Sequence, residues 1–529
     1  MSLKLLISLF CVALSTIFLS GCYFVDPAAL GDVAHCPGDR WFPCPRDDPR
    51  DIPILASAET VSEKWNAHEG PWEVVDLLDI ALLNNPLTWQ SWESARASAF
   101  SWWATQSTLY PAVTFNEEYL VNKIEGSVTG STVGAITNNN VNFLNSGIVN
   151  NTNLLNATSP FAANGVPRGV ANAGNASAAA AAVVTPPPPT FNQWLISSVS
   201  FSYLMLDFGG RTAFIESARQ ALLAADWTYN RNMQTIVVTV LTDYYLHLQA
   251  KALFAARELD LKDSLETYVA AEAQFQAGVT TIVDVFLARS NLANAELQLE
   301  QARGMVKTTL GQLATVLGLP ANTEFGVGDL PSNINLDVLN TNVDALIAIA
   351  KLERPDLAAA EAMWRQAREN ITVTWSSGMP TITANGFAQD THNIHFPPLS
   401  SRLYSGSLML NVPIFNGFLY VNETRSAEAT AAAALAAWKN QEETVMLDVV
   451  TSYYNFTTAL ETVKFSNEFY EYTKKAFDAA LEAYKTGAGN ILNVLTAQTQ
   501  LSDARAQQIQ ARVQLLVSLA DIAYATGQL

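Results

Sequence analysis

The chain has 529 residues, 49% of them hydrophobic and 15% charged, and 49 acidic against 30 basic side chains give a formal net charge of −19. This length can bury a large core, and an acidic balance without a basic patch excludes a nucleic-acid partner. The sequence contains no nucleophile–base pair, no phosphate loop and no Cys/His metal spacing, which argues against an enzyme, a metal site and a non-covalent cofactor.

The N-terminus has the form of a secretory signal. Lys4 and the apolar run that follows it predict a signal peptide over residues 1–21. The small residues of "LSGC" before Cys22 resemble a bacterial lipobox, so Cys22 is expected to be the first mature residue, carrying acyl chains as a covalent lipid anchor. Residues 22–70 then form a lipid-anchored linker, and Tyr23 in place of aspartate favours the outer membrane by analogy with lipoproteins. The alternative is an ordinary signal peptide in which Cys22 has no role.

Two further cysteines, Cys36 and Cys44, lie close together in the stretch "HCPGDRWFPCP". An exported compartment permits disulfides, so these two residues are a candidate pair. Zinc is a weaker alternative, because His35 is the only adjacent third ligand and no fourth is evident.

The chain contains an internal duplication. The segment "QAGVTTIVDVFLARSNLANAE" at residues 276–296 returns as "KTGAGNILNVLTAQTQLSDAR" at residues 485–505, an offset of 209 residues. Pro86 and Pro355, near the start of each copy, are 269 residues apart. The change of offset means that the first copy carries about 60 extra residues, which fall mostly within residues 123–193.

Each copy has the same predicted order of elements: a helix, a pair of strands, a very long helix, a tight turn and a shorter returning helix. The alanine-rich long helices need neighbours along their whole length, which helix-on-helix packing provides. The expected elements are the first structural repeat at residues 71–318 and the second at 344–529, opening helices over 71–108 and 344–376, long helices over about 211–276 and 418–486, and tip turns at 276–280 and 485–490.

Alternating apolar and polar residues predict two strands in each copy. The fold class is therefore mainly α with a small β part. Four strands cannot close a barrel around a pore, and open strand edges are not tolerated in lipid, so several chains must contribute to one barrel. The strands are expected at about 109–122, 195–207, 379–390 and 405–415, and the low-complexity segment 123–193 is expected to be a long exposed loop.

At this point the chain resembles the TolC-type outer-membrane efflux channels, in their lipid-anchored branch. The residues that carry the resemblance are "NNPLTWQSWESARAS" and "ERPDLAAAEAMWRQAR" at the start of each copy, "LMLDFGGRTAFIESARQA" at the corner from strand to helix, and "AGVTTIVDVFLARSNLANAE" at the first tip turn. The resemblance implies a homotrimer, with a 12-stranded outer-membrane β-barrel continued by a 12-helix periplasmic α-barrel. Residues 319–343 would form an equatorial linker.

The resemblance also implies that the two turns form the closed periplasmic tip. Gly278, Gly487 and Gly489 are expected to supply the positive φ angles of these turns. Acidic residues just after the turn line the aperture in such channels. The matching positions are Asp284 and, 209 residues later, Asn493. A trimer would thus carry one ring of three carboxylates, unless Asp284 only decorates the start of its helix.

The function that the resemblance implies is a passive exit duct of a tripartite efflux pump. Its partners would be a periplasmic adaptor, an inner-membrane transporter and outer-membrane lipid. Two alternatives are the outer-membrane channel of a type I protein secretion system and, more remotely, a non-conducting periplasmic coiled-coil scaffold.

Overall fold

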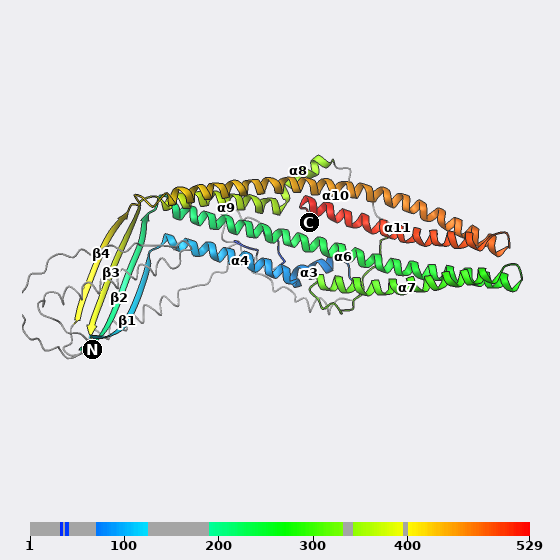
Figure 1. Ribbon diagram of the computed structural model, residues 1–529, viewed down its shortest axis with the longest axis horizontal. Helices are drawn as coiled ribbons and strands as arrows, with labels where there is room; N and C mark the ends of the chain where they lie inside the picture. The colour runs from blue at the N-terminus through cyan, green and yellow to red at the C-terminus, as the bar shows by residue number, and fades with distance from the viewer. Residues whose placement is uncertain (1–31, 35–37, 42–69, 125–189, 332–341, 395–399) are drawn as a thin grey trace, which may run out of the picture. The chain divides into compact units, whose positions relative to one another are not determined.

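A computed structural model describes residues 32–34, 38–41, 70–124, 190–331, 342–394 and 400–529. These residues form two compact units, each described here by itself: a sheet unit within residues 111–205 and 382–410, and a helical unit that contains the rest (Figure 1). No helix in the described part of the chain combines the length and the apolar character needed to cross a membrane.

Two 67-residue helices run through the helical unit. At 1.5 Å per residue each is about 100 Å long, and each is followed by a tight turn and a returning helix (Figure 1). The helices of the unit are α3 (Val74–Asn84), α4 (Pro86–Gln106), α6 (Gly210–Gln276), α7 (Ile282–Val316), α8 (Val343–Glu353), α9 (Pro355–Ser377), α10 (Leu419–Lys485) and α11 (Ile491–Thr526), with a 3-10 turn at Ser107–Leu109.

The prediction of one continuous helix at the start of each repeat was wrong. Helix α3 ends before Asn85 and α8 ends before Arg354, and both residues have extended backbone with ψ of 126° and 119°. The cause is the next residue, because proline disfavours helical backbone in the residue before it. Pro86 and Pro355 then begin new helices at a position where the missing N–H costs nothing.

Buried ion pairs stabilise the break between α8 and α9. Arg354 is 3% exposed and its guanidinium pairs with Asp356 at 2.5 Å and Asp448 at 3.0 Å. The pair with Asp448 ties the junction of α8 and α9 to α10.

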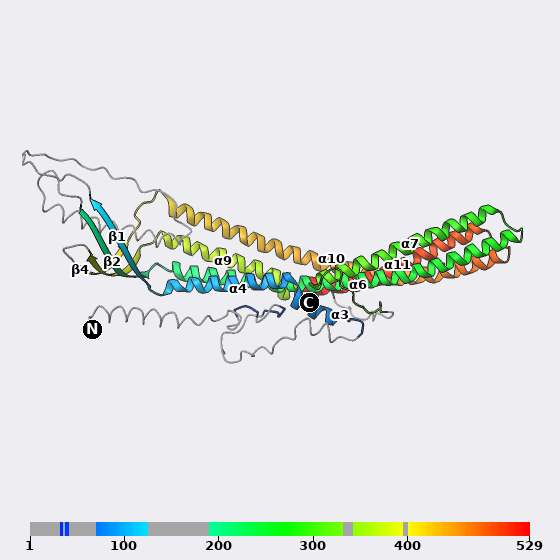
Figure 2. The same cartoon turned by 90° about the horizontal axis from the view of Figure 1, so that it is seen from below.

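The helices pack through small and branched side chains. Helix α6 contacts α3, α4, α7, α9 and α11, whereas α10 contacts α8, α9 and α11 and makes a small contact with α6. One apolar cluster joins α3, α6 and α7 to the segment after α7, and another joins α8, α9, α10 and α11. Figure 2 shows α4 lying beside α6, and it shows α6, α7, α10 and α11 continuing together toward the two turns.

The expected linker at 319–343 is described as far as residue 331, and residues 332–341 lie outside the described part. Trp72 donates its backbone N–H to the Gly326 carbonyl at 2.8 Å, and Trp72 pairs with Val327 in an isolated bridge. This linker therefore closes over α3 at the start of the first repeat.

The sheet unit has four strands in the order β1-β2-β3-β4. Strands β1 and β2 are antiparallel in a register that pairs Ala112 with Ser202 and Ile124 with Thr190. The strand bounds are β1 (Ala112–Ile124), β2 (Thr190–Leu206), β3 (Thr381–Asn393) and β4 (Ser400–Asn411).

Three prolines account for three of the eight differences from the predicted strand ends. β1 and β3 begin directly after Pro111 and Pro380, and β4 ends before Pro413 rather than reaching residue 415. Proline has no N–H to donate to a ladder. At the other ends, β1 and β2 extend into the predicted loop 123–193, so its first two and last four residues are strand; residues 125–189 lie outside the described part of the chain.

The outer strands of this sheet carry uncovered apolar side chains. On β1, Val113, Phe115, Tyr119 and Val121 alternate with other residues, and at least half of each side chain is exposed. Strand β4 is exposed along its whole length. Two open edges with apolar side chains are what a sheet shows when its neighbouring strands come from elsewhere.

A left-handed corner begins each long helix. Phe208 and Gly209 have φ of 52° and 92°, and Gly417 and Phe418 have φ of 61° and 64°. In the first corner Asp207 accepts from the backbone N–H of Arg211 at 2.5 Å. Asp207, Phe208 and Gly209 therefore form the turn that leads into α6.

Candidate functional site: the paired tip turns

The two tip turns have the same hydrogen-bond pattern. In the first, the N–H groups of Gly278 and Val279 donate to the carbonyls of Phe275 and Gln274, at 2.9 and 3.0 Å. In the second, the N–H groups of Gly487 and Ala488 donate to the carbonyls of Tyr484 and Ala483, both at 2.9 Å. This pair of bonds is the Schellman motif, which needs a left-handed residue after the helix.

Gly278 and Gly487 supply that residue, with φ of 74° and 77°. The expectation that Gly489 also has positive φ was wrong. Its lack of a side chain serves close packing instead, because a Cβ there would lie 2.8 Å from the Tyr484 nitrogen and 3.0 Å from the Ala483 carbonyl carbon.

The predicted aperture residues have different surroundings. Asp284 lies in the first turn of α7, where a negative charge favours the helix. Burial first, and the charge of Asp284 to a smaller extent, raise the pKa of the Tyr484 phenol at the end of α10. Asn493 is exposed on α11, and its neighbour Asn490 caps that helix by accepting from Leu492 N–H at 2.8 Å.

Side-chain contacts next to the turns join the first hairpin, α6 and α7, to the second hairpin, α10 and α11. The Gln274 side chain donates to the Lys485 carbonyl at 2.8 Å, and the Lys485 ammonium pairs with Glu266 at 2.7 Å. An apolar cluster in the same region takes residues from α6, α7, α10 and α11: Ala271, Ala288, Phe477, Leu481, Tyr484, Ile491, Val494, Ala497 and Leu501.

A buried polar layer lies further from the turns. The Gln498 amide donates to the Ser264 hydroxyl at 2.6 Å, and its oxygen accepts from Asn291 at 2.9 Å. Gln498 and Ser264 are 5% and 2% exposed. One side chain of α11 therefore links α6 of the other repeat with α7.

A charged layer follows on the same helices. Asp260, 6% exposed, accepts from Arg505 at 2.5 Å, from Ser502 at 2.7 Å and from Arg257 at 2.9 Å. Arg505 also pairs with Asp263 at 2.8 Å, although burial outweighs this pairing and raises the pKa of the Asp263 carboxyl. The sequence analysis did not predict either layer. The signal that could have pointed to them is a polar residue at a position of the helix face where the other residues are apolar.

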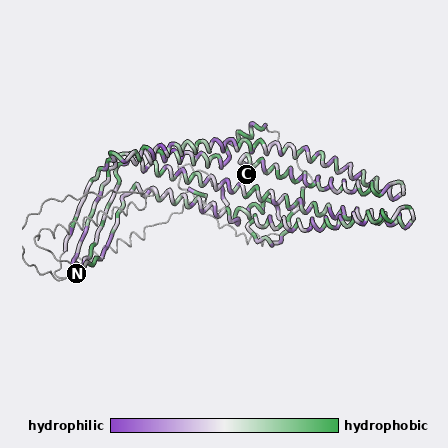
Figure 3. The backbone as a smooth tube through the Cα atoms, in the orientation of Figure 1, coloured by the Kyte–Doolittle hydropathy of each residue, from purple (hydrophilic) through white to green (hydrophobic). Residues whose placement is uncertain are grey.

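Large apolar side chains remain exposed around the turns. Figure 3 shows green segments near the far ends of both hairpins. Val279, Val283, Phe286 and Leu492 are each 57–66% exposed. A patch of this kind marks a surface that contacts another molecule.

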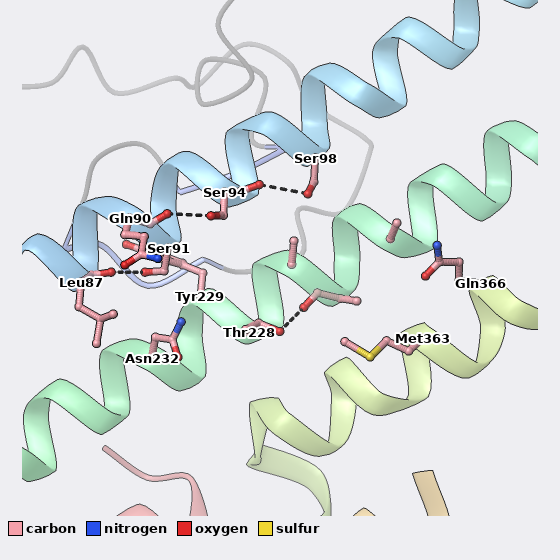
Figure 4. A pocket seen from close by; sticks show the side chains of 13 residues that line it. Leu87, Gln90, Ser91, Ser94, Ser98, Thr228, Tyr229, Asn232, Met363 and Gln366 are labelled. Carbon is pink, nitrogen blue, oxygen red and sulfur yellow. Dashed lines mark hydrogen bonds between the residues drawn. The ribbon is translucent and has the colours of Figure 1, made fainter. Parts of the chain in front are cut away.

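A groove of about 340 Å³ lies elsewhere in the helical unit, between α4, α6 and α9 (Figure 4). Ser91 donates to the Leu87 carbonyl, Ser94 to that of Gln90 and Ser98 to that of Ser94, so these hydroxyls are engaged by their own helix (Figure 4). No acid or base lines the groove, whose residues are Leu87, Gln90, Ser91, Ser94, Ser98, Ala221, Ala224, Ala225, Thr228, Tyr229, Asn232, Met363 and Gln366. It therefore offers hydrogen bonds but no proton transfer near neutral pH.

Within the described residues, no three His, Cys, Asp or Glu side chains are placed to hold a metal ion. Asp390 and His392 are 3.2 Å apart on β3, without a third such ligand there. Cys22, Cys36 and Cys44 all lie outside the described residues.

Comparisons with known proteins agree with this architecture. The outer membrane efflux protein model matches residues 169–319 and 346–528. Protein CyaE of Bordetella pertussis is 24% identical over 336 residues, covering 63% of this chain and 71% of that protein. The pyoverdine export outer membrane protein OpmQ of Pseudomonas putida is 27% identical over 331 residues, covering 62% and 68%. The outer-membrane channel OprN superposes with a TM-score of 0.68 at 18% identity, over 86% of this chain and 89% of OprN.

The fold is thus that of the outer-membrane channels built from duplicated helical hairpins and strand pairs. The chain belongs to the outer membrane efflux protein family. It is an outer-membrane efflux component, as the sequence predicted.

Proposed function

We propose that the chain works as a homotrimeric, passive exit duct of a tripartite efflux pump. The observation that carries this proposal is the four-stranded sheet with two open, apolar edges. Three copies would join these edges into a closed barrel of twelve strands, since a four-stranded sheet cannot close around a pore. The exposed apolar side chains near the tip turns would be covered in the same assembly.

An adaptor and an inner-membrane transporter are the proposed partners. The adaptor would bind the opened tip better than the closed one and shift the equilibrium toward opening. Opening would separate the hairpins of neighbouring copies, while the Asp260–Arg505 and Gln498 layers keep the two hairpins of one chain together.

Small molecules are the proposed cargo, because the relative from Pseudomonas putida is named for pyoverdine export. The uncharged groove and the family support a duct without catalysis of its own. The lipid on Cys22 and the Asp284 ring at the aperture belong to the same proposal.

The test uses the full chain, extracted in detergent and returned to planar bilayers. Native mass spectrometry is expected to give three copies, and bilayer recording is expected to give a channel of low resting conductance. Cells that lack their own outer-membrane efflux component should regain drug resistance when this chain is supplied with its adaptor and transporter. A monomer that neither assembles nor conducts would contradict the proposal and would favour the scaffold alternative.

A further inference from the structure

A short N-terminal strap, residues 32–34 and 38–41, lies across α4 and α6. Val33, Ala34 and Trp41 are buried against these helices. The strap is held by hydrogen bonds from Trp103 Nε1 to Asp32 Oδ2 (2.9 Å), Trp92 Nε1 to the Ala34 carbonyl (2.9 Å), Trp41 N–H to Asn230 Oδ1 (2.9 Å), Asn230 Nδ2 to the Trp41 carbonyl (2.7 Å) and Tyr229 Oη to the Asp39 carbonyl (2.7 Å).

Asp226 lies between the two apolar clusters that the strap completes. Leu222 packs in the cluster of Val33, whereas Tyr229 packs in the cluster of Ala34 and Trp41. Asp226 falls between Leu222 and Tyr229 on α6, at a spacing that places all three on one helix face. Its side chain is 0% exposed, and neither carboxyl oxygen has a hydrogen-bond partner among the described residues.

The charges around Asp226 favour its neutral form. Burial and, second, the charge of Asp32 on the strap raise the pKa of Asp226 to about 9. On α4 the charged side chains of Glu93 and Arg96 pair with each other at 2.9 Å. The strap's own Asp39 and Arg40 are exposed. Among the described residues an ionised carboxylate at this position would have no counter-ion, which is far more costly than a buried neutral acid.

We propose that the strap is seated on the helical unit together with one proton on Asp226, so that its docking weakens as pH rises. Once the strap leaves, Asp226 meets water and returns to the acidity of an ordinary carboxyl. The docked state therefore binds one more proton than the undocked state throughout the neutral range. Linkage then gives a loss of about tenfold in the docking equilibrium for each pH unit. The strap is therefore bound strongly to the helical unit in acid and weakly in mild alkali.

Hydrogen exchange of the full chain in lipid nanodiscs tests this. The backbone N–H groups of Gly38 and Trp41 report docking, because they donate to Tyr229 Oη at 3.2 Å and Asn230 Oδ1 at 2.9 Å. After correction for intrinsic exchange, their protection is expected to fall about tenfold per unit between pH 6 and pH 8. Asp226→Asn is expected to keep high protection with no pH slope.

A matched control is Asp243→Asn, which removes a carboxyl 17 residues further along α6 whose pKa is also raised by burial. It should leave the slope at Gly38 and Trp41 unchanged. Asp32→Asn keeps an acceptor for Trp103 but removes the second charge, so it should raise protection at pH 8 above the wild-type value. Protection in the wild-type chain that does not depend on pH, or an Asp226→Asn slope equal to that of the wild type, overturns the proposal.

Discussion

The two long helices, α6 and α10, are equal in length and unequal in what they bury. Each has 67 residues, yet α6 buries 22 of them and α10 buries 11. The buried residues of α6 include Gln220, Asp226, Asn230, Gln234, His247 and Asp260, whereas those of α10 are apolar apart from Ser466, Thr473 and Tyr484. The two copies of the long helix have thus diverged in their buried residues. Helix α6 is the central one, and its polar side chains bind the helices that surround it.

The largest expected effect comes from the charged layer on α6. Arg505→Ala would leave Asp260 buried with fewer partners, and breaking a buried ion pair in this way costs about 3–5 kcal/mol. Thermal unfolding followed by circular dichroism in detergent measures the loss. The control lies on α10: Lys475→Ala breaks a pair with Glu471 in which both side chains are exposed, and it should leave the unfolding temperature unchanged. Equal effects of the two variants would remove the distinction between the central and the outer helix.

Acid should act on α6 through His247, whose counterpart 209 residues later is the apolar Phe456. Burial and, second, the Lys251 charge lower the pKa of His247 to about 4. The unfolded chain therefore binds more protons than the folded one between about pH 6.5 and pH 4, so stability is full above this window and falls as pH drops through it. The loss amounts to about 3 kcal/mol.

His247→Phe copies the second repeat into the first and removes the titrating group. Unfolding of this variant should lose the part of the acid sensitivity that lies between pH 6.5 and pH 4, while Phe456→Leu on α10 should leave that part in place. An acid profile that His247→Phe does not change would assign the sensitivity to other groups.

The tip turns reverse the comparison, because Gly489, which stands where the first repeat has Thr280, packs closely against the Tyr484 backbone. Gly489→Ala would press a Cβ onto the Tyr484 backbone, at an expected cost of about 2 kcal/mol. Gly278→Ala meets no atom within 4 Å and is opposed only by its positive φ, at about 1 kcal/mol. Denaturant titration of both variants gives the order, and a larger loss for Gly278→Ala would show that backbone conformation outweighs packing at the tip.

The sequence predicted the repeat, the two long helices and the turns, because each of these segments occurs twice and the similarity of the two copies can be recognised without any knowledge of packing. It located the strands to within about five residues, and the prolines that set three of their eight ends were not used as stops. The same oversight joined α3 to α4 and α8 to α9.

The buried polar layers could not be predicted in the same way. Neighbours can lie along any face of a helix 67 residues long, and nothing in the local sequence says that Asp260 faces Arg505, 245 residues away in the chain. Asp226 was likewise invisible, since its environment depends on a strap that lies far from it in the chain. Asp284 was found through the family resemblance, and Asn493 through the offset of 209 residues between the two copies. The structure adds that the charge of Asp284, on the first hairpin, contributes to the raised pKa of Tyr484 on the second.

The smallest effect on stability, and the most direct comparison of the hairpins, is expected from exchanging these two residues. Asp284→Asn makes the first tip match the second. Because Asp284 supports its helix only from the first turn, unfolding should shift by less than about 1 kcal/mol. In a trimer the same change removes three carboxylates from the proposed aperture, so cation preference in bilayer recordings should fall. Asn493→Asp should raise it, because Asn493 is exposed and an added carboxylate there stays hydrated. If both variants conduct with the wild-type ion preference, the aperture is formed by other residues and Asp284 only favours the start of α7.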